Sequence, residues 1–272
     1  MEDDIIKRAE DLIKKSGSQI KEPDSSLDET IKRLERLTNG SESDFKIIFA
    51  FDTTMSMYHC IERVRANIGK VVYELLTKEN NIDIMVAGVG EYGDAPYTLQ
   101  IKNYSNNPEH LKYNIDSIRK TCGAHPVHGG TGQVSLELLF EELNKKYISG
   151  VNNALIVITD QIAHGQDHTV PNPKADYKKE LLYLKKYLKG FYFVSCSNRQ
   201  EIIGLQKELI NNNDPNEKFI MLDEFDILTE LVIALTKKSI SREKFDNYIR
   251  TLQQSSDPKD KIAAEKIKGY LI

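Results

Sequence analysis

Cysteine is scarce in this sequence of 272 residues, and so are the signals of export. The three cysteines, Cys60, Cys122 and Cys196, are odd in number and lack metal-type spacing, which suits a reducing compartment. The chain opens on the acidic Met-Glu-Asp-Asp instead of a basic segment followed by an apolar one, so no secretory signal is expected. No apolar run approaches the length needed to span a bilayer. These absences predict a cytoplasmic protein with no membrane segment.

An excess of basic charge is also lacking. The formal net charge is −4, which argues against a dedicated nucleic-acid binder. The two ends differ in sign, because residues 1–44 carry 8 basic and 12 acidic side chains and residues 237–272 carry 9 and 5. The hydrophobic content of 40% and charged content of 29% are those of an ordinary globular protein. At this length, one large or two small domains are expected.

Short apolar runs alternate with amphipathic helical patterns along most of the chain. Strands are predicted at 46–52, 82–89, 97–102, 153–160, 190–196 and 218–222. Helices are predicted at 57–78, 108–120, 132–147, 175–188, 199–211, 224–238, 241–254 and 258–271. Only a short link joins the second and third strands, so the third must run antiparallel at an edge.

This alternation predicts an α/β fold of the three-layer, doubly wound (Rossmann-like) type, with a mainly parallel six-stranded sheet and one antiparallel edge strand. Helical patterns outside that region predict three parts. These are an N-terminal helical arm (1–43), the α/β domain (44–238) and a pair of C-terminal helices (239–272).

Oxygen-bearing side chains cluster where predicted strands end. Asp52, Thr54 and Ser56 follow the first strand on alternate positions, Thr131 belongs to a Gly-Gly-Thr loop before a helix, and Asp160 ends the fourth strand. Ligands of doubly wound folds bind at the carboxyl ends of strands. Five hard oxygens suit a divalent cation, Mg²⁺ first and Mn²⁺ or Ca²⁺ as alternatives. The sequence therefore predicts a metal site with one position open to an outside ligand.

These motifs resemble those of the von Willebrand factor A domain of intracellular type, with its metal-ion-dependent adhesion site. Asp52-Thr53-Thr54-Met55-Ser56 is similar to the family's Asp-x-Ser-x-Ser, although intracellular members usually carry Gly at the position of Met55. The resemblance implies that Thr54, Ser56 and Thr131 bind the ion directly, and that Asp52 and Asp160 bind it through water. It covers about residues 44–238.

The resemblance also implies a function and a class of partner. The cation would capture an Asp or Glu of a partner protein, which makes the chain a non-enzymatic adaptor or scaffold module. Intracellular relatives serve AAA+ ATPases or kinase–phosphatase systems, so such a component is the expected partner. His128, His164 and Gln161 are candidates for the rim of the partner site.

Several other interpretations stay open at this point. Taken singly, the site residues are also explained as strand ends, helix caps and turn caps. A Mg-dependent phosphoesterase with Asp52 as its nucleophile is the alternative function, although Thr54 stands where that chemistry needs a second Asp. A structural adaptor acting through its terminal helices is a third. Gly88-Val89-Gly90-Glu91-Tyr92-Gly93 matches a dinucleotide pattern, but a strand follows it instead of a helix, so it is rejected.

Overall fold

A computed structural model describes residues 44–77, 81–122, 133–148, 150, 152–166, 173–222 and 225–271. All of them belong to one compact unit, Ser43–Ile272. The predicted N-terminal arm lies outside the described residues.

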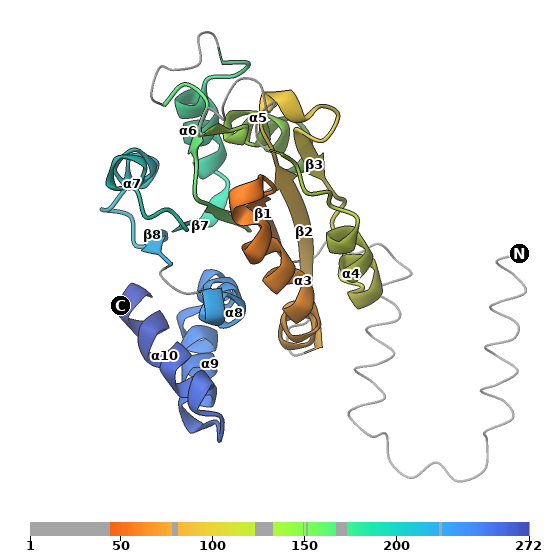
Figure 1. The fold of residues 1–272 in the computed structure, drawn as a ribbon. Helices are drawn as coiled ribbons and strands as arrows, with labels where there is room; N and C mark the ends of the chain where they lie inside the picture. Colours follow the sequence, from red (N-terminus) through yellow and green to blue (C-terminus); the bar gives the residue numbers. More distant parts are fainter. Residues whose placement is uncertain are drawn as a thin grey trace, which may run out of the picture. The chain divides into compact units, whose positions relative to one another are not determined.

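A six-stranded sheet forms the centre of this unit (Figure 1). Its strands are β1 (Phe45–Asp52), β2 (Ile82–Val89), β3 (Leu99–Ile101), β5 (Asn153–Thr159), β7 (Leu188–Ser195) and β8 (Glu217–Met221), in the spatial order β3-β2-β1-β5-β7-β8. Every pair is parallel except β2 with β3. The predicted mainly parallel α/β sheet with one antiparallel edge strand is therefore confirmed.

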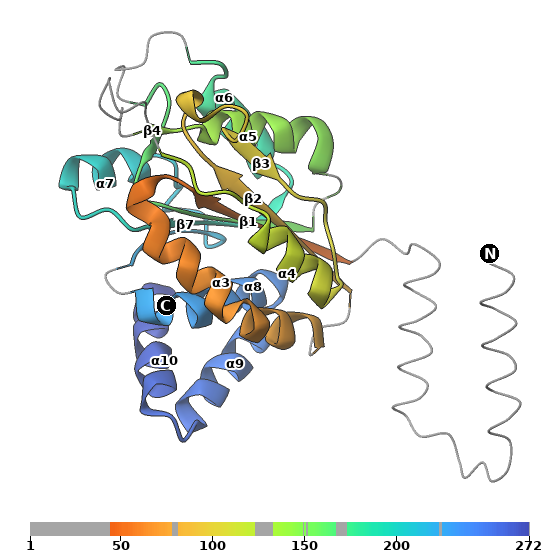
Figure 2. The ribbon, with the colours of Figure 1, turned by 45° about the vertical axis from the view of Figure 1, so that its right-hand side comes forward.

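Helices cover both faces of the sheet (Figure 2). The first face carries α3 (Tyr58–Val72), α4 (Pro108–Asp116) and α8 (Leu228–Ile240), and α9 (Arg242–Gln254) and α10 (Pro258–Leu271) pack against α8 on the side away from the sheet. The second face carries α5 (Leu136–Glu142) and α6 (Tyr177–Lys185). Successive side chains of a strand point to opposite faces, so β1 supplies both cores. Its Ile47, Phe49 and Phe51 pack with the first set of helices, while Ile48 and Ala50 pack with the second.

Shorter elements complete the fold. They are α7 (Gln200–Lys207), the helical turns η1 (Met55–Met57), η2 (Tyr73–Thr77), η3 (Tyr92–Asp94), η4 (Leu143–Tyr147) and η5 (Phe225–Ile227), and a parallel pair of two-residue strands, β4 (Gln133–Val134) and β6 (Ile162–Ala163). The helix predicted at 57–78 is thus divided into η1, α3 and η2. The helix predicted at 132–147 begins later than expected, because β4 takes its first residues.

The strand order creates one crevice at the carboxyl edge of the sheet. The chain passes from β1 to β2 through α3 on one face, and from β5 to β7 through α6 on the other. β1 and β5 are neighbours, so the order reverses between them, and this is where doubly wound sheets bind their ligands. Among the described residues, no helix combines the length and apolarity that crossing a membrane requires.

Candidate functional site

Four of the five predicted metal-site residues meet at this crevice. Asp52 ends β1, and its Oδ1 accepts hydrogen bonds from Thr54 N at 2.7 Å and Thr54 Oγ1 at 2.6 Å. Ser56 Oγ lies 3.4 Å from Thr54 Oγ1 and donates to Asp160 Oδ1 at 3.1 Å. A continuous polar chain therefore runs from the end of β1 to the residue after β5. The fifth residue, Thr131, lies outside the described residues.

Two threonines that the sequence analysis did not single out hold this arrangement in place. Thr159, the last residue of β5, donates from its Oγ1 to Asp52 Oδ2 at 2.8 Å and accepts from Gln161 N at 2.9 Å. Thr53 Oγ1 donates to Val89 O at 3.2 Å and lies 3.0 Å from Thr121 Oγ1. Both threonines are fully buried. The available signal was position alone, since each adjoins an aspartate at a strand end.

Asp52 carries its carboxylate in a strongly desolvated place. Its side chain is 1% exposed, and burial raises the pKa of Asp52 to about 7. Hydrogen bonds from Thr54 and Thr159 oppose this rise by stabilising the charged form, while the nearby charge of Asp160 adds to it. Asp52 is thus enclosed by hydrogen-bond donors of the chain itself, and its contacts with Thr54 fix the turn after β1.

The three predicted rim residues lie in different surroundings. His164 is buried, its ring stacks on Tyr92 with centroids 3.8 Å apart, and its Nδ1 lies 3.3 Å from Glu137 Oε1. Gln161 is partly exposed, and its Oε1 accepts a hydrogen bond from Arg199 at 3.2 Å. His128 lies outside the described residues.

An exposed apolar side chain stands beside this polar chain. Met55, the first residue of η1, is 60% exposed. The turn beneath it is fixed, because Met57 N donates to Thr54 O at 3.0 Å and Thr54 is held by Asp52. Ser56 and His59 are exposed next to it in sequence. Met55 is thus an exposed apolar side chain on a hydrogen-bonded turn, with polar residues around it.

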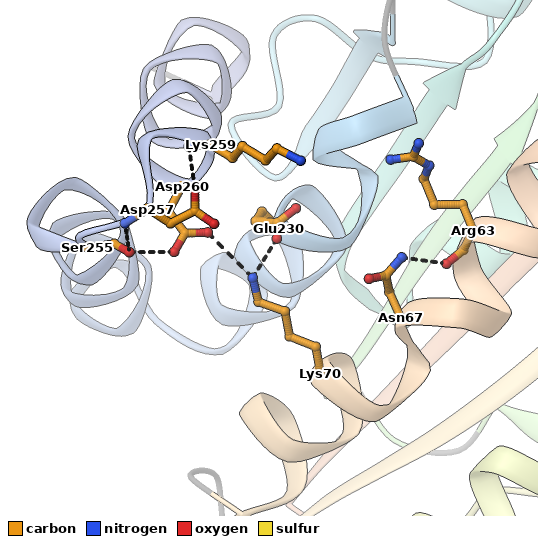
Figure 3. Close-up of polar contacts among 8 residues, drawn as sticks. All are labelled: Arg63, Asn67, Lys70, Glu230, Ser255, Asp257, Lys259 and Asp260. Carbon is orange, nitrogen blue, oxygen red and sulfur yellow. Dashed lines mark hydrogen bonds and ion pairs between the residues drawn. The ribbon is translucent and has the colours of Figure 1, made fainter.

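A second concave site, which the sequence analysis missed, lies between α3, η5 and α10. This groove of about 520 Å³ is lined by residues of both charges. Lys70 of α3 reaches Glu230 Oε1 of α8 at 2.7 Å and Asp260 Oδ1 of α10 at 3.5 Å (Figure 3). Arg63 pairs with Asp226. Lys70 and Arg63 are thus paired with acids of the groove's own lining, and these contacts join α3 to the helical segments around it.

The comparisons with known proteins found likeness in structure only. No family model matches the chain, and no curated protein matches it. Two solved structures of the pilus adhesin SpaC from Lactobacillus rhamnosus GG match with TM-scores of 0.52 and 0.50, at 10% and 12% identity. Both matches cover 76% of this chain and 31% of SpaC. The PilB minor pilin from Streptococcus sanguinis matches with a TM-score of 0.47 at 13% identity, covering 76% of this chain and 62% of PilB.

These findings correct the family predicted from the sequence. The matched structures with a TM-score of 0.50 or more are of a pilus adhesin, so the assignment to the von Willebrand factor A family and its metal-ion-dependent adhesion site is wrong. At such low identity the likeness concerns the fold alone. The chain spans only part of each matched protein.

The predicted function is corrected with it. The intracellular metal-dependent adaptor was an implication of that family assignment, so it is wrong together with the assignment. The described residues contain no group of three or more His, Cys, Asp and Glu side chains placed to hold a metal ion. The prediction that these residues form a metal-binding site for magnesium is therefore not supported. The phosphoesterase alternative fails for a physical reason as well. Both oxygens of Asp52 are hydrogen-bonded and its side chain is 1% exposed, which leaves no path for attack on a phosphate ester.

Proposed function

We propose that this chain is a non-catalytic binding module of the adhesin type, which contacts a protein ligand at the carboxyl edge of its sheet. The contact surface, called here the edge surface, consists of Met55, Ser56, His59, Gln161 and Arg199. The single observation that carries the proposal is the 60% exposure of Met55 on a turn fixed by Asp52.

Physical reasons favour this role for Met55. An exposed methionine gains free energy only when a partner covers it, and its flexible thioether adapts to an apolar pocket. A rigid turn lowers the entropy lost on binding, because the backbone is already ordered before the partner arrives. The polar residues around Met55 supply the rim that surrounds such an anchor in protein interfaces. The fold-level likeness to a pilus adhesin supports the same role.

The test is a solid-phase binding assay with the purified chain over immobilised collagen, fibronectin, fibrinogen and mucin. We expect saturable binding to at least one of them, and a loss of about tenfold in affinity in Met55→Ser, which corresponds to about 1.4 kcal/mol. Ile262→Ser is the matched control, because Ile262 is 55% exposed on α10, outside the edge surface. Absence of saturable binding to all four proteins, or equal binding by Met55→Ser, would contradict the proposal.

Several expectations from the sequence remain predictions beside this proposal. They are the divalent cation, the cytoplasmic location, and an AAA+ or kinase–phosphatase partner that presents an acidic residue. The proposal depends on none of them. Running the same binding assay in Mg²⁺ and in EDTA tests the cation directly, since binding lost in EDTA and restored by Mg²⁺ supports it and unchanged binding contradicts it.

A further inference from the structure

The outer face of α6 carries a pattern that the edge surface does not use. Five consecutive positions of the helical wheel are exposed, and they belong to Lys178, Leu182, Lys186, Lys179 and Tyr183 in angular order. At about 100° per residue these five cover an arc of about 140°. Here they are called the α6 surface. The opposite side of α6 is buried through Tyr177, Leu181 and Leu184.

Along the helix axis, two apolar groups lie in the middle of the α6 surface, one turn after Lys178 and Lys179 and one turn before Lys186. Leu182 is 68% exposed and Tyr183 is 46% exposed, next to each other in sequence. The Tyr183 hydroxyl lies 3.2 Å from that of Tyr187, and the two rings are 5.5 Å apart and tilted. Two adjacent large apolar side chains exposed to this extent are more than the scattered single exposures of an ordinary surface.

Lysines border these apolar groups, and none of the three is neutralised by the rest of the described chain. Lys178, Lys179 and Lys186 are exposed, and no described acidic side chain forms an ion pair with them. Lys186 instead lies over the Tyr183 ring at 5.4 Å from its centroid. On η4, by contrast, Lys145 and Lys146 pair with Glu141 and Glu142 at 2.6 Å and 2.8 Å. The α6 surface is therefore locally basic on a chain whose net charge is −4.

We propose that the α6 surface docks an acidic amphipathic helix of a partner protein. Its apolar face covers Leu182 and Tyr183, and its carboxylates pair with the surrounding lysines. The charge complementarity fixes the acidic sign of the partner, and the apolar centre fixes its amphipathic character. This surface belongs to α6, on the opposite helical layer from α3 and α8 (Figure 2), whereas the edge surface belongs to η1, the start of α3 and the segments after β5 and β7.

The observations favour a helix over a nucleic acid or a lipid surface. Nucleic-acid surfaces offer exposed ring faces for stacking, but here Lys186 already occupies a face of Tyr183. The most exposed apolar group of the α6 surface is Leu182, and its aliphatic side chain offers no ring on which a base could stack. A membrane-surface helix needs a long apolar stripe, whereas α6 spans nine residues and buries its main apolar side inside the protein.

The test measures fluorescence anisotropy of a labelled synthetic peptide titrated with the full chain. The peptide is a helix of Leu, Glu and Ala, with leucines along one side and glutamates on both flanks, and its twin carries Lys in place of Glu. We expect saturable binding of the acidic peptide, weakened about tenfold or more by Leu182→Asp and by Lys179→Glu combined with Lys186→Glu. Affinity should also fall as salt rises, because exposed charges are screened.

Tyr113→Asp on α4 is the matched control, since Tyr113 is 72% exposed on another helix. Circular dichroism of each variant verifies that the fold is retained, which is expected because every changed side chain is exposed. Three results would overturn the proposal. These are absence of saturable binding, equal binding by the α6 variants and the control, and tighter binding of phosphatidylserine vesicles or single-stranded DNA than of the acidic peptide.

Discussion

Asp52 illustrates how one residue can be well stabilised by hydrogen bonds and still be costly in its charged form. Three donors, Thr54 N, Thr54 Oγ1 and Thr159 Oγ1, point at its two oxygens. Burial nevertheless outweighs them, and the pKa of Asp52 is raised to about 7. The residue that organises the turn after β1 is therefore close to half protonated near neutral pH.

Stability should depend on pH through this residue. Because the folded pKa of Asp52 lies above its unfolded value of 3.8, the folded state binds more protons between these values, and stability falls as pH rises from about 4 to about 7. Asp52→Asn imitates the protonated form and should remove this dependence, with a gain in stability on the order of a few kcal/mol at pH 8. Urea unfolding at pH 5 and pH 8, in EDTA, measures the effect.

A control separates this effect from a general change in charge. Asp116→Asn changes an exposed carboxylate near the end of α4 and should leave the pH dependence as it is in the parent chain. The prediction is contradicted if the free energy of unfolding changes equally between pH 5 and pH 8 in the parent chain and in Asp52→Asn. The charged form of Asp52 would then carry no cost in the folded protein.

At the residue scale, the sequence predicted which side chains lie close together but not how buried each of them is. Asp52, Thr54, Ser56 and Asp160 could be brought together from the sequence, because each stands at or just after a strand end and parallel strands end at one edge. Thr159 could not be ranked above other threonines, since its role depends on the neighbouring strand. His164 was predicted at a rim from its loop position, but its ring is buried against Tyr92.

At the scale of elements, ion pairs connect helices that are far apart in sequence. Burial lowers the pKa of Lys70, but its hydrogen bond and charge interaction with Glu230 and the charge of Asp260 outweigh this and raise it. The contacts join α3 to α8 and α10 (Figure 3). Lys70 is 42% exposed while Glu230 is 11% exposed, so loss of the lysine leaves a mostly buried carboxylate unpaired.

Lys70→Met should destabilise the fold by about 1–2 kcal/mol, more than an exposed pair contributes, because Glu230 loses its counter-charge. Denaturant unfolding of Lys70→Met, Glu230→Gln and the double variant measures the coupling. Lys145→Met is the control, since it breaks an exposed i, i+4 pair and should cost about 0.5 kcal/mol or less. Equal losses in the two lysine variants would show that the helix-joining contact adds nothing.

The same scale shows which elements a sequence pattern can reveal. Long apolar or amphipathic runs predicted β1, β2, β5 and α9 close to their observed bounds. The pair β4 and β6 was missed, because two-residue strands are too short to show a period of two. The helical turns η1 and η2 at the two ends of the predicted 57–78 helix were missed as well, since a change of helical hydrogen bonding leaves the side-chain periodicity almost unchanged.

At the scale of the whole molecule, the C-terminal helices share the core of the sheet. Phe245, Ile249 and Leu252 of α9 and Ile267 of α10 are buried in the same apolar cluster as Phe49 of β1 and Leu231 of α8. The sequence could place these helices but not their packing, because amphipathic stripes do not specify which surface they cover. Whether the predicted division at residue 238 separates two independent parts therefore depends on whether the sheet folds without α9 and α10.

A chain ending at residue 240 should fail to fold cooperatively. Removing α9 and α10 takes away their buried side chains and exposes the apolar residues of α8 that they cover, and each large side chain is worth about 1.5–3 kcal/mol of burial. Four such side chains already approach the 5–15 kcal/mol by which a typical domain is stable. Urea unfolding and size-exclusion chromatography of the truncated chain measure this, and Phe245→Ala in the full chain should lose about 3–5 kcal/mol without truncation. A truncated chain that unfolds cooperatively at the parent's urea midpoint would instead show that residues 239–272 are a separate part, as the sequence pattern predicted.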